Sequence, residues 1–184
     1  MRALQSFFFA SLIAAGQSAR ADLSVGQIYS LKFIDVDKNT LLTSDGHVNV
    51  IVLAAPLNVP KAQMTGDHVP DYCLGNPTYR MITVVKFTKH RSPVRALLTA
   101  GVRRRLNAEA KRVQPRYDAN KITRDPRREI FAVADFDGTT VSQLGAPPSV
   151  DFRAFVFGRN GELLGQWNNV PSAEELAVVL KKSD

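Results

Sequence analysis

The chain of 184 residues has only one cysteine, Cys73. An intrachain disulfide needs two cysteines, so none can form, and a zinc site built from several cysteines is excluded as well. The three histidines, His47, His68 and His90, are scattered and lack the spacing of metal ligands. We therefore predict no metal site, and the sequence indicates no cofactor.

Long apolar runs are equally scarce, and the longest lies at the N-terminus. One positive charge precedes an apolar run at residues 3–15, and Ala19-Arg20-Ala21 provides a small-residue cleavage site. This pattern is typical of a secretory signal peptide that is cut before Asp22. A membrane-spanning helix needs about 20 apolar residues, more than this run supplies. We expect residues 1–21 to be removed and residues 22–184 to form one exported domain, in the periplasm or outside the cell.

Two acidic turns have the oxygen ligands that calcium prefers. They are Asp35-x-Asp37-x-Asn39 and Asp135-x-Asp137-Gly138. Neither has the glycine at position six and the glutamate at position twelve of a calcium-binding loop. We interpret both as turns that end strands.

The positive charge is concentrated in one part of the chain. The whole sequence has 24 Lys and Arg against 17 Asp and Glu, whereas residues 80–128 have 15 basic and three acidic residues. A long helix is predicted for residues 93–117, because five apolar residues fall near one face: Leu97, Val102, Leu106, Ala110 and Val113. The basic residues on its other faces are Arg103, Arg104, Arg105, Lys111 and Arg112.

This basic helix has two interpretations. It is either a solvated face around an apolar stripe that packs on a sheet, or a surface that docks on an acidic protein or an anionic membrane. Export makes nucleic acid an unexpected partner. The sequence gives no indication of the oligomeric state.

Alternating strands and helices predict an α/β fold. The apolar run at residues 48–53 is typical of a central strand buried on both faces. Turn residues and β-branched residues predict further strands at residues 28–36, 41–43, 79–87, 130–136, 152–157 and 162–167. Capping and breaking residues predict further helices at residues 59–74, with a break at Pro70, and at residues 141–145 and 172–182. The order predicts a mixed sheet with helices on both faces.

Two stretches resemble the thioredoxin-like thiol reductases of the periplasm. The stretch A-F-V-F-G-R-N-G-E-L-L-G-Q-W at residues 154–167, with P-S-A-E-E-L at residues 171–176, is similar to their closing β-hairpin and helix. Residues 50–61 lie where that family has its buried strand and active-site turn. The resemblance implies a thioredoxin-like three-layer sandwich, a central mixed sheet flanked by helices. An N-terminal β-hairpin and the extended basic helix are additions to it.

The resemblance does not extend to the active-site residues of the family. It places Asn58-Val59-Pro60-Lys61 over the Cys-x-Pro-Cys of the family, and it leaves Phe152 or a neighbour where the family has a cis-proline. A dithiol reductase needs a thiolate at the helix N-terminus and a second thiol within reach. An amide and an ammonium group provide neither, so dithiol exchange at this turn is excluded. A peroxiredoxin Pro-x-x-x-Thr/Ser-x-x-Cys motif is also lacking, because Val69-Pro70-Asp71-Tyr72 precedes Cys73.

Two functions from different classes follow. The first is a non-catalytic binding or scaffold protein that uses the basic helical face, and it is the one we favour. The alternative is a thiol- or peroxide-linked oxidoreductase that acts through Cys73, or an enzyme that holds an anion at the helix N-terminus near Asn58. Cys73 is predicted near the end of the first helix, where the helix dipole disfavours a thiolate. We interpret it as a structural thiol, with pairing to another chain or a small thiol as the alternative.

Overall fold

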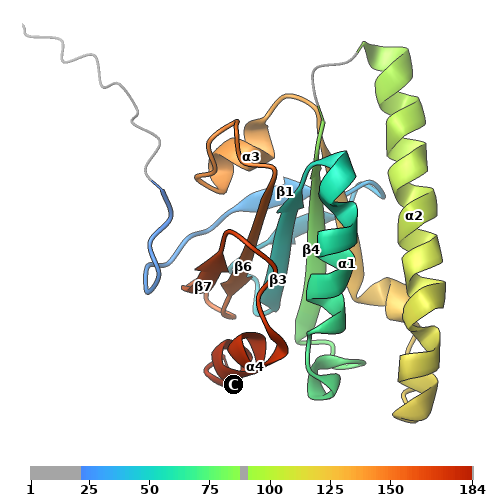
Figure 1. Ribbon diagram of the computed structural model, residues 1–184, viewed down its shortest axis with the longest axis vertical. Coiled ribbons are helices and arrows are strands. Elements are labelled where there is room, and N and C mark those ends of the chain that lie inside the picture. The colour runs from blue at the N-terminus through green and yellow to red at the C-terminus, as the bar shows by residue number, and fades with distance from the viewer. Residues whose placement is uncertain (1–21, 88–90, 184) are drawn as a thin grey trace, which may run out of the picture.

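The computed structural model describes residues 22–87 and 91–183, and the statements below refer to these residues. A five-stranded mixed sheet with strand order β5-β4-β3-β6-β7 forms the centre (Figure 1). The parallel strands are β3 (Val48–Ala54), β4 (Tyr79–Lys86) and β5 (Ile130–Asp135). β6 (Phe152–Phe157) and β7 (Leu163–Trp167) complete it with antiparallel pairing. All seven residues of β3 are buried, which confirms the central strand.

The predicted N-terminal hairpin is also present. β1 (Lys32–Ile34) pairs with β2 (Thr40–Leu42) in antiparallel register. β1 is shorter than the strand predicted for residues 28–36, because Ile28 forms an isolated bridge with Glu162 instead. The strand ends at Asp35, whose carboxylate accepts hydrogen bonds from the turn that follows.

Four α-helices connect or follow the strands. α1 ends where Pro70 and a short 3-10 helix, η2 (Asp71–Cys73), break the predicted helix, since proline has no N–H to donate. The last helix begins at a capping box formed by Ser172 and Glu175. The helices are α1 (Val59–Asp67), α2 (Ser92–Ala119), α3 (Thr139–Gln143) and α4 (Ala173–Lys181). No described helix has the length and apolar content to cross a membrane.

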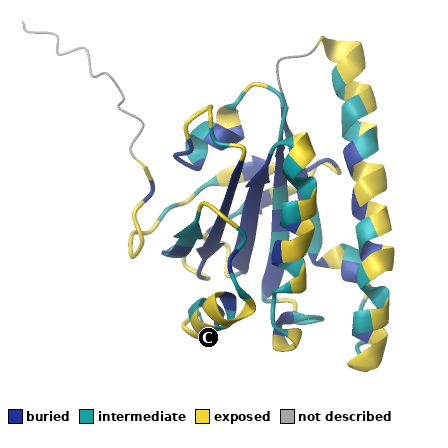
Figure 2. Ribbon diagram, viewed as in Figure 1, coloured by how far each residue is buried: buried dark blue, intermediate teal, exposed yellow. Residues whose placement is uncertain are grey.

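The sheet separates two layers. The hairpin and α3 cover one face, where Phe33, Ile51, Ile82 and Phe155 belong to one large apolar cluster. α1, α2 and α4 lie on the other face (Figure 2), where the buried residues divide into three smaller clusters. The structure is therefore the predicted three-layer sandwich, with one uninterrupted core and one divided core.

α2 is longer than the sheet that it covers. Its 28 residues span about 42 Å at 1.5 Å per residue, whereas the eight residues of β4 span about 26 Å. Val102 and Leu106 pack against Val85 and Ala132 of the sheet as predicted, and Ala110 is buried as well. The prediction is wrong for Leu97, which is 73% exposed. Nine residues, or about two and a half helical turns, separate it from Leu106, so it lies on the opposite face of α2.

Candidate functional site

The turn between β3 and α1 has the place of a thioredoxin active site but none of its thiols. Asn58 ends the 3-10 helix η1 (Pro56–Asn58), and its side-chain amide donates to the backbone oxygen of Asp151 at 3.4 Å. The Nζ of Lys61 lies 5.5 Å from the centre of the Phe152 ring. Both side chains thus contact the segment at the start of β6. None of the described peptide bonds is cis.

Cys73 is far from this turn and buried. It lies in η2, after the C-terminal end of α1, whereas Asn58 precedes the N-terminus of that helix. The nine residues of α1, a length of about 14 Å, lie between the two positions. Only 3% of the surface of Cys73 is exposed, and it packs with Val48 and Val50. The thiol of Cys73 is thus enclosed by apolar side chains.

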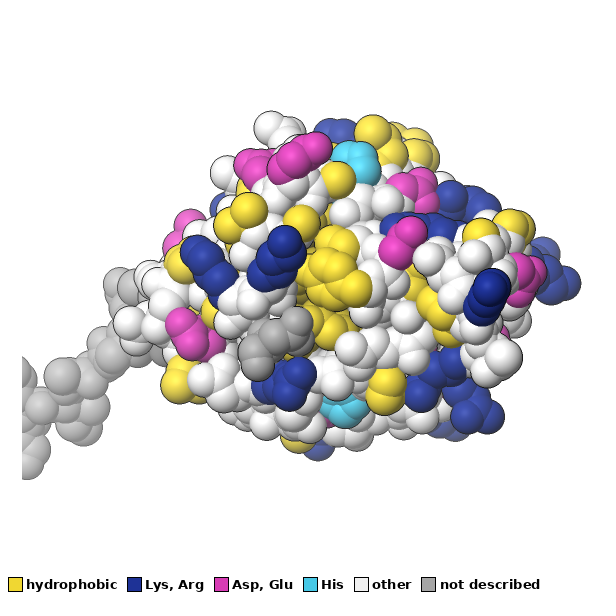
Figure 3. All heavy atoms as spheres, turned by 90° about the horizontal axis from the view of Figure 1, so that it is seen from below, with side chains coloured by type: hydrophobic (Ala, Val, Ile, Leu, Met, Phe, Trp, Pro, Cys, Tyr) yellow, Lys and Arg dark blue, Asp and Glu magenta, His cyan; other side chains and the backbone are white. Residues whose placement is uncertain are grey.

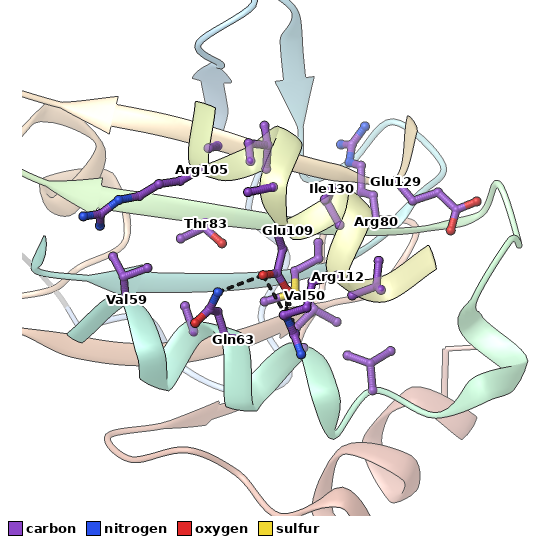
Figure 4. A pocket seen from close by; sticks show the side chains of 18 of the residues that line it. Val50, Val59, Gln63, Arg80, Thr83, Arg105, Glu109, Arg112, Glu129 and Ile130 are labelled. Carbon is purple, nitrogen blue, oxygen red and sulfur yellow. Dashed lines mark hydrogen bonds and ion pairs between the residues drawn. The ribbon is translucent and has the colours of Figure 1, made fainter. Parts of the chain in front are cut away.

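A groove of about 600 Å³ lies between α1 and α2 (Figure 4). Its floor is the helix-covered face of the sheet. The exposure of the side chains in the middle of β4 shows that this floor is open to solvent. Ile82 and Val84 point to the other face and are fully buried, whereas Met81 and Thr83 point into the groove and are only half-buried. β4, an interior strand of the sheet, is therefore reachable from outside on one of its two faces.

A polar bridge crosses the groove between the two helices (Figure 4). Gln63 on α1 donates from Nε2 to the carboxylate of Glu109 on α2 at 2.8 Å. Arg112 donates to Glu109 at 2.6 Å and to Asp67 at 2.7 Å. Hydrogen bonds to Glu109 and then to Asp67 raise the pKa of Arg112 above its usual value. We call Gln63, Asp67, Glu109 and Arg112 the polar bridge.

Many basic residues between positions 80 and 128 already have acidic partners inside the molecule. Arg80, for example, is buried and binds Asn49 and Asp45. The paired acids are mostly far away in the sequence. Among the described residues, the ion pairs are Arg80–Asp45, Lys86–Asp151, Arg103–Asp37, Arg112–Asp67, Arg112–Glu109, Arg116–Asp71, Arg124–Glu129 and Arg127–Asp37.

The five cations that the sequence predicted on the surface of the basic helix differ in whether they form ion pairs within the molecule. Arg103 binds Asp37 and the backbone oxygen of Val36, and Arg112 belongs to the polar bridge, so neither is a free basic residue as the sequence suggested. In the part of the chain that the structure describes, Arg104, Arg105 and Lys111 are exposed and have no ion pair. They are the remaining candidates for an anionic partner.

The acidic partners are held in their charged form. Burial would raise the pKa of Asp37, but hydrogen bonds from Arg103 and Arg127 outweigh it, so this pKa lies below its usual value. Asp45 behaves in the same way, with burial opposed by hydrogen bonds from His47 and Arg80. These carboxylates fix the basic segment to the hairpin, so they serve the fold rather than a site.

Arg105 lies at one end of the groove. α1 and α2 both follow parallel strands and run in the same direction, and Gln63 contacts Glu109 across the groove. One helical turn earlier on each helix are Val59 and Arg105, which therefore lie at the same level. Figure 4 shows Thr83 on the floor between them. Arg105 thus lies at the end of the groove that is formed by the start of α1, next to the turn at residues 58–61.

The end of the molecule that carries α4 has charges of both signs. Apolar side chains gather near the middle of this face, and acidic and basic side chains lie around them (Figure 3). The positive surplus of the sequence does not form a continuous patch there. Among the described residues, no group of three or more His, Cys, Asp or Glu side chains could hold a metal ion.

Comparisons with known proteins identify the architecture. No protein-family model and no curated protein sequence matches the chain. Among solved structures, a DsbF homologue from Corynebacterium diphtheriae is 12% identical, with a TM-score of 0.51 over 97% of this chain and 99% of that one. The chain has a thioredoxin-like fold.

Two further thioredoxin-like structures agree with this assignment. DsbF of MTB is 12% identical with a TM-score of 0.53, over 84% of this chain and 96% of that one. A thiol:disulfide interchange protein of the thioredoxin family from Chlorobium tepidum is 10% identical with a TM-score of 0.51, over 89% and 99%. At such identities the similarity concerns the fold alone. The single cysteine of this chain is consistent with a thioredoxin-like domain without a Cys-x-x-Cys motif.

Sequence reasoning missed the groove and most of its polar residues. Gln63, Thr83 and Glu109 carry no motif, and their contacts depend on how two helices are spaced over the sheet. One signal was available. Thr83 is a hydroxyl residue in the middle of the apolar run I-T-V-V at residues 82–85, where a fully covered central strand would favour an aliphatic residue.

Proposed function

We propose that this chain is an exported, non-catalytic binding or scaffold protein that uses a thioredoxin-like fold without dithiol chemistry. Its binding side is helix α2, with the groove toward α1 and the free cations Arg104, Arg105 and Lys111. The observation that carries this proposal is the open floor of the groove. Met81 and Thr83 on β4 are reachable from outside in a space of about 600 Å³, a volume typical of ligand sites.

The state of the thiol supports a binding role over an oxidoreductase. A redox thiol reacts as an accessible thiolate, whereas Cys73 is 3% exposed and packed among apolar residues. Asn58 and Lys61 hold the two positions at which a dithiol would act. We therefore assign Cys73 to the core.

An uncharged apolar fluorophore, N-phenyl-1-naphthylamine, tests the groove directly. Residues 22–184 should bind it saturably, and Thr83→Phe should weaken binding at least about tenfold because the new ring fills the floor. Ile34→Phe adds the same ring on the hairpin, where Ile34 is 52% exposed, and should leave binding unchanged. Thr83→Leu is a milder filling variant, and unfolding midpoints show that each variant is folded. Absence of saturable binding, or equal binding in Thr83→Phe, would refute the proposal.

An insulin-reduction assay and a peroxidase assay test the alternative. We expect no activity from the purified mature protein in either assay. Activity that disappears in Cys73→Ser would make the protein an enzyme and overturn the proposal. Export is tested by N-terminal sequencing of the protein from the extracytoplasmic fraction, which should begin at Asp22.

The free cations extend the binding side toward an acidic protein partner or an anionic membrane surface. Such an attachment depends on charge and should weaken steeply with salt. Retention on anionic vesicles would identify the membrane as the partner. Retention that salt does not reduce, or that survives Arg104→Gln with Lys111→Gln, would show that these cations play no part.

A further inference from the structure

We infer that the groove between α1 and α2 binds a single-chain amphiphile with an anionic headgroup, of the type of a long-chain carboxylate. This inference rests on the proposed function and names the ligand class of the same groove. Its three supports are the shape of the groove, the distribution of charge along it, and an unpaired hydroxyl group on its floor.

The shape of the groove favours a thin chain over a folded partner. Its apolar lining includes Val50, Met81, Leu106, Val113 and Ile130, and it follows α1 over about 14 Å. The polar bridge crosses the middle of this space and narrows its mouth there, because Nε2 of Gln63 is only 2.8 Å from the carboxylate of Glu109. A helix or strand of another protein, about 10 Å wide with its side chains, cannot pass beneath it. A flexible hydrocarbon chain can.

The charge along the groove is uneven. Arg112 and Arg116, toward the C-terminal end of α1, are neutralised by Asp67, Glu109 and Asp71. Arg105 at the other end is exposed and has no ion pair within the described chain. An anion is therefore favoured at that end, and apolar groups are favoured along the rest.

The hydroxyl group of Thr83 supports the same orientation. It lies on the floor between Val59 and Arg105 (Figure 4), and no hydrogen bond joins it to another described residue. The hydroxyl group is half-buried, so it can donate to a ligand without first breaking a hydrogen bond within the described chain. A carboxylate at this end can accept hydrogen bonds from both Thr83 and Arg105, while its tail extends under the polar bridge toward Val50.

A displacement assay with the neutral fluorophore on residues 22–184 tests the inference. Octanoate, dodecanoate and hexadecanoate should displace it below their micelle concentrations, with affinity rising about fourfold per methylene until the groove is full. Dodecanoate should bind at least about tenfold more tightly than dodecanol, because only the carboxylate pairs with Arg105.

Two exposed arginines provide a matched pair of variants. Arg105→Gln should abolish the preference for carboxylate over alcohol, whereas Arg104→Gln, its neighbour with the same charge, should retain it. Thr83→Val should lower the affinity for dodecanoate a few-fold, because it removes only the hydroxyl donor on the floor. Unfolding midpoints verify that all three variants fold.

Three results would overturn the inference. They are displacement without a dependence on chain length, an equal loss in Arg104→Gln and Arg105→Gln, and binding of the amphiphile only when it is part of a vesicle. If the fluorophore binds but no carboxylate displaces it, the inference fails and the proposed function stands. If the fluorophore itself does not bind, the proposed function fails.

Discussion

The two faces of the central sheet are covered in different ways. On the face under the hairpin and α3, Ile51, Ile82 and Phe155 are completely buried in a single cluster. On the face under α1 and α2, Met81 and Thr83 stay half-buried in the middle of β4, next to the central strand. Apolar packing closes the first face, whereas polar contacts such as Gln63–Glu109 span the second.

This difference indicates that one face of the sheet stabilises the fold and the other is available for binding. Close packing gives a face its stability, since each buried apolar side chain contributes a transfer term and fills space. Polar contacts between partly exposed helices contribute much less. The packed face therefore holds the domain together, and the loosely covered face is available for binding. The following substitutions test the contrast.

The largest loss of stability is expected on the packed face. Phe155→Ala should lower the free energy of unfolding by about 3–5 kcal/mol, because it removes a buried ring and leaves a cavity. Thr83→Val on the groove face is the matched control and should change it by less than about 0.5 kcal/mol. Urea unfolding followed by circular dichroism measures both. Equal losses at the two positions would contradict the contrast.

The next largest loss in the free energy of unfolding is expected when the buried cation Arg80 is replaced. Arg80 binds Asn49, Asp45 and the backbone oxygen of Leu42. Arg80→Met should cost about 3 kcal/mol, because the buried amide of Asn49 loses its partner. Arg104→Gln, which replaces an exposed and unpaired cation, should have no measurable effect in the same unfolding experiment. If Arg80→Met lowers the free energy of unfolding only slightly, Arg80 does not stabilise the fold, and this prediction is contradicted.

Asp37, whose carboxylate joins the hairpin to α2, should contribute less to the free energy of unfolding. Its contribution should depend on pH. Asp37 accepts hydrogen bonds from Arg103 and Arg127, and its pKa in the folded state lies below its value in the unfolded state. The stability that it contributes is therefore present above the unfolded pKa of about 3.9 and disappears as the pH falls through the folded pKa.

Asp37→Asn should cost about 1 kcal/mol at neutral pH, since the pair is partly exposed and screened by solvent. The difference from the wild type should vanish in acid, below the folded pKa. Unfolding midpoints measured across this pH range provide the test. A difference that persists at the lowest pH would show that the carboxylate acts through its shape and not its charge.

Local sequence signals predicted the elements better than the site. The apolar run of β3 and the Ser172 capping box of α4 are local features, and both were predicted close to their final bounds. The pairing of Arg103 with Asp37 joins residues that are 66 positions apart, so a count of charge within the basic segment could not show it. The thioredoxin-like order was predictable because it follows from the sequence of strands and helices. The groove was not, because it depends on the distance between α1 and α2.

The most direct measurement of the open groove uses two adjacent positions on β4. Thr83→Cys and Val84→Cys, each in a Cys73→Ser background, point to opposite faces of the same strand, and Val84 is fully buried. Ellman's reagent should label the native Thr83→Cys protein at a rate approaching that of the unfolded chain. It should label Val84→Cys only after denaturation. Equal protection of both thiols in the native protein would show that the groove is closed and would contradict the account.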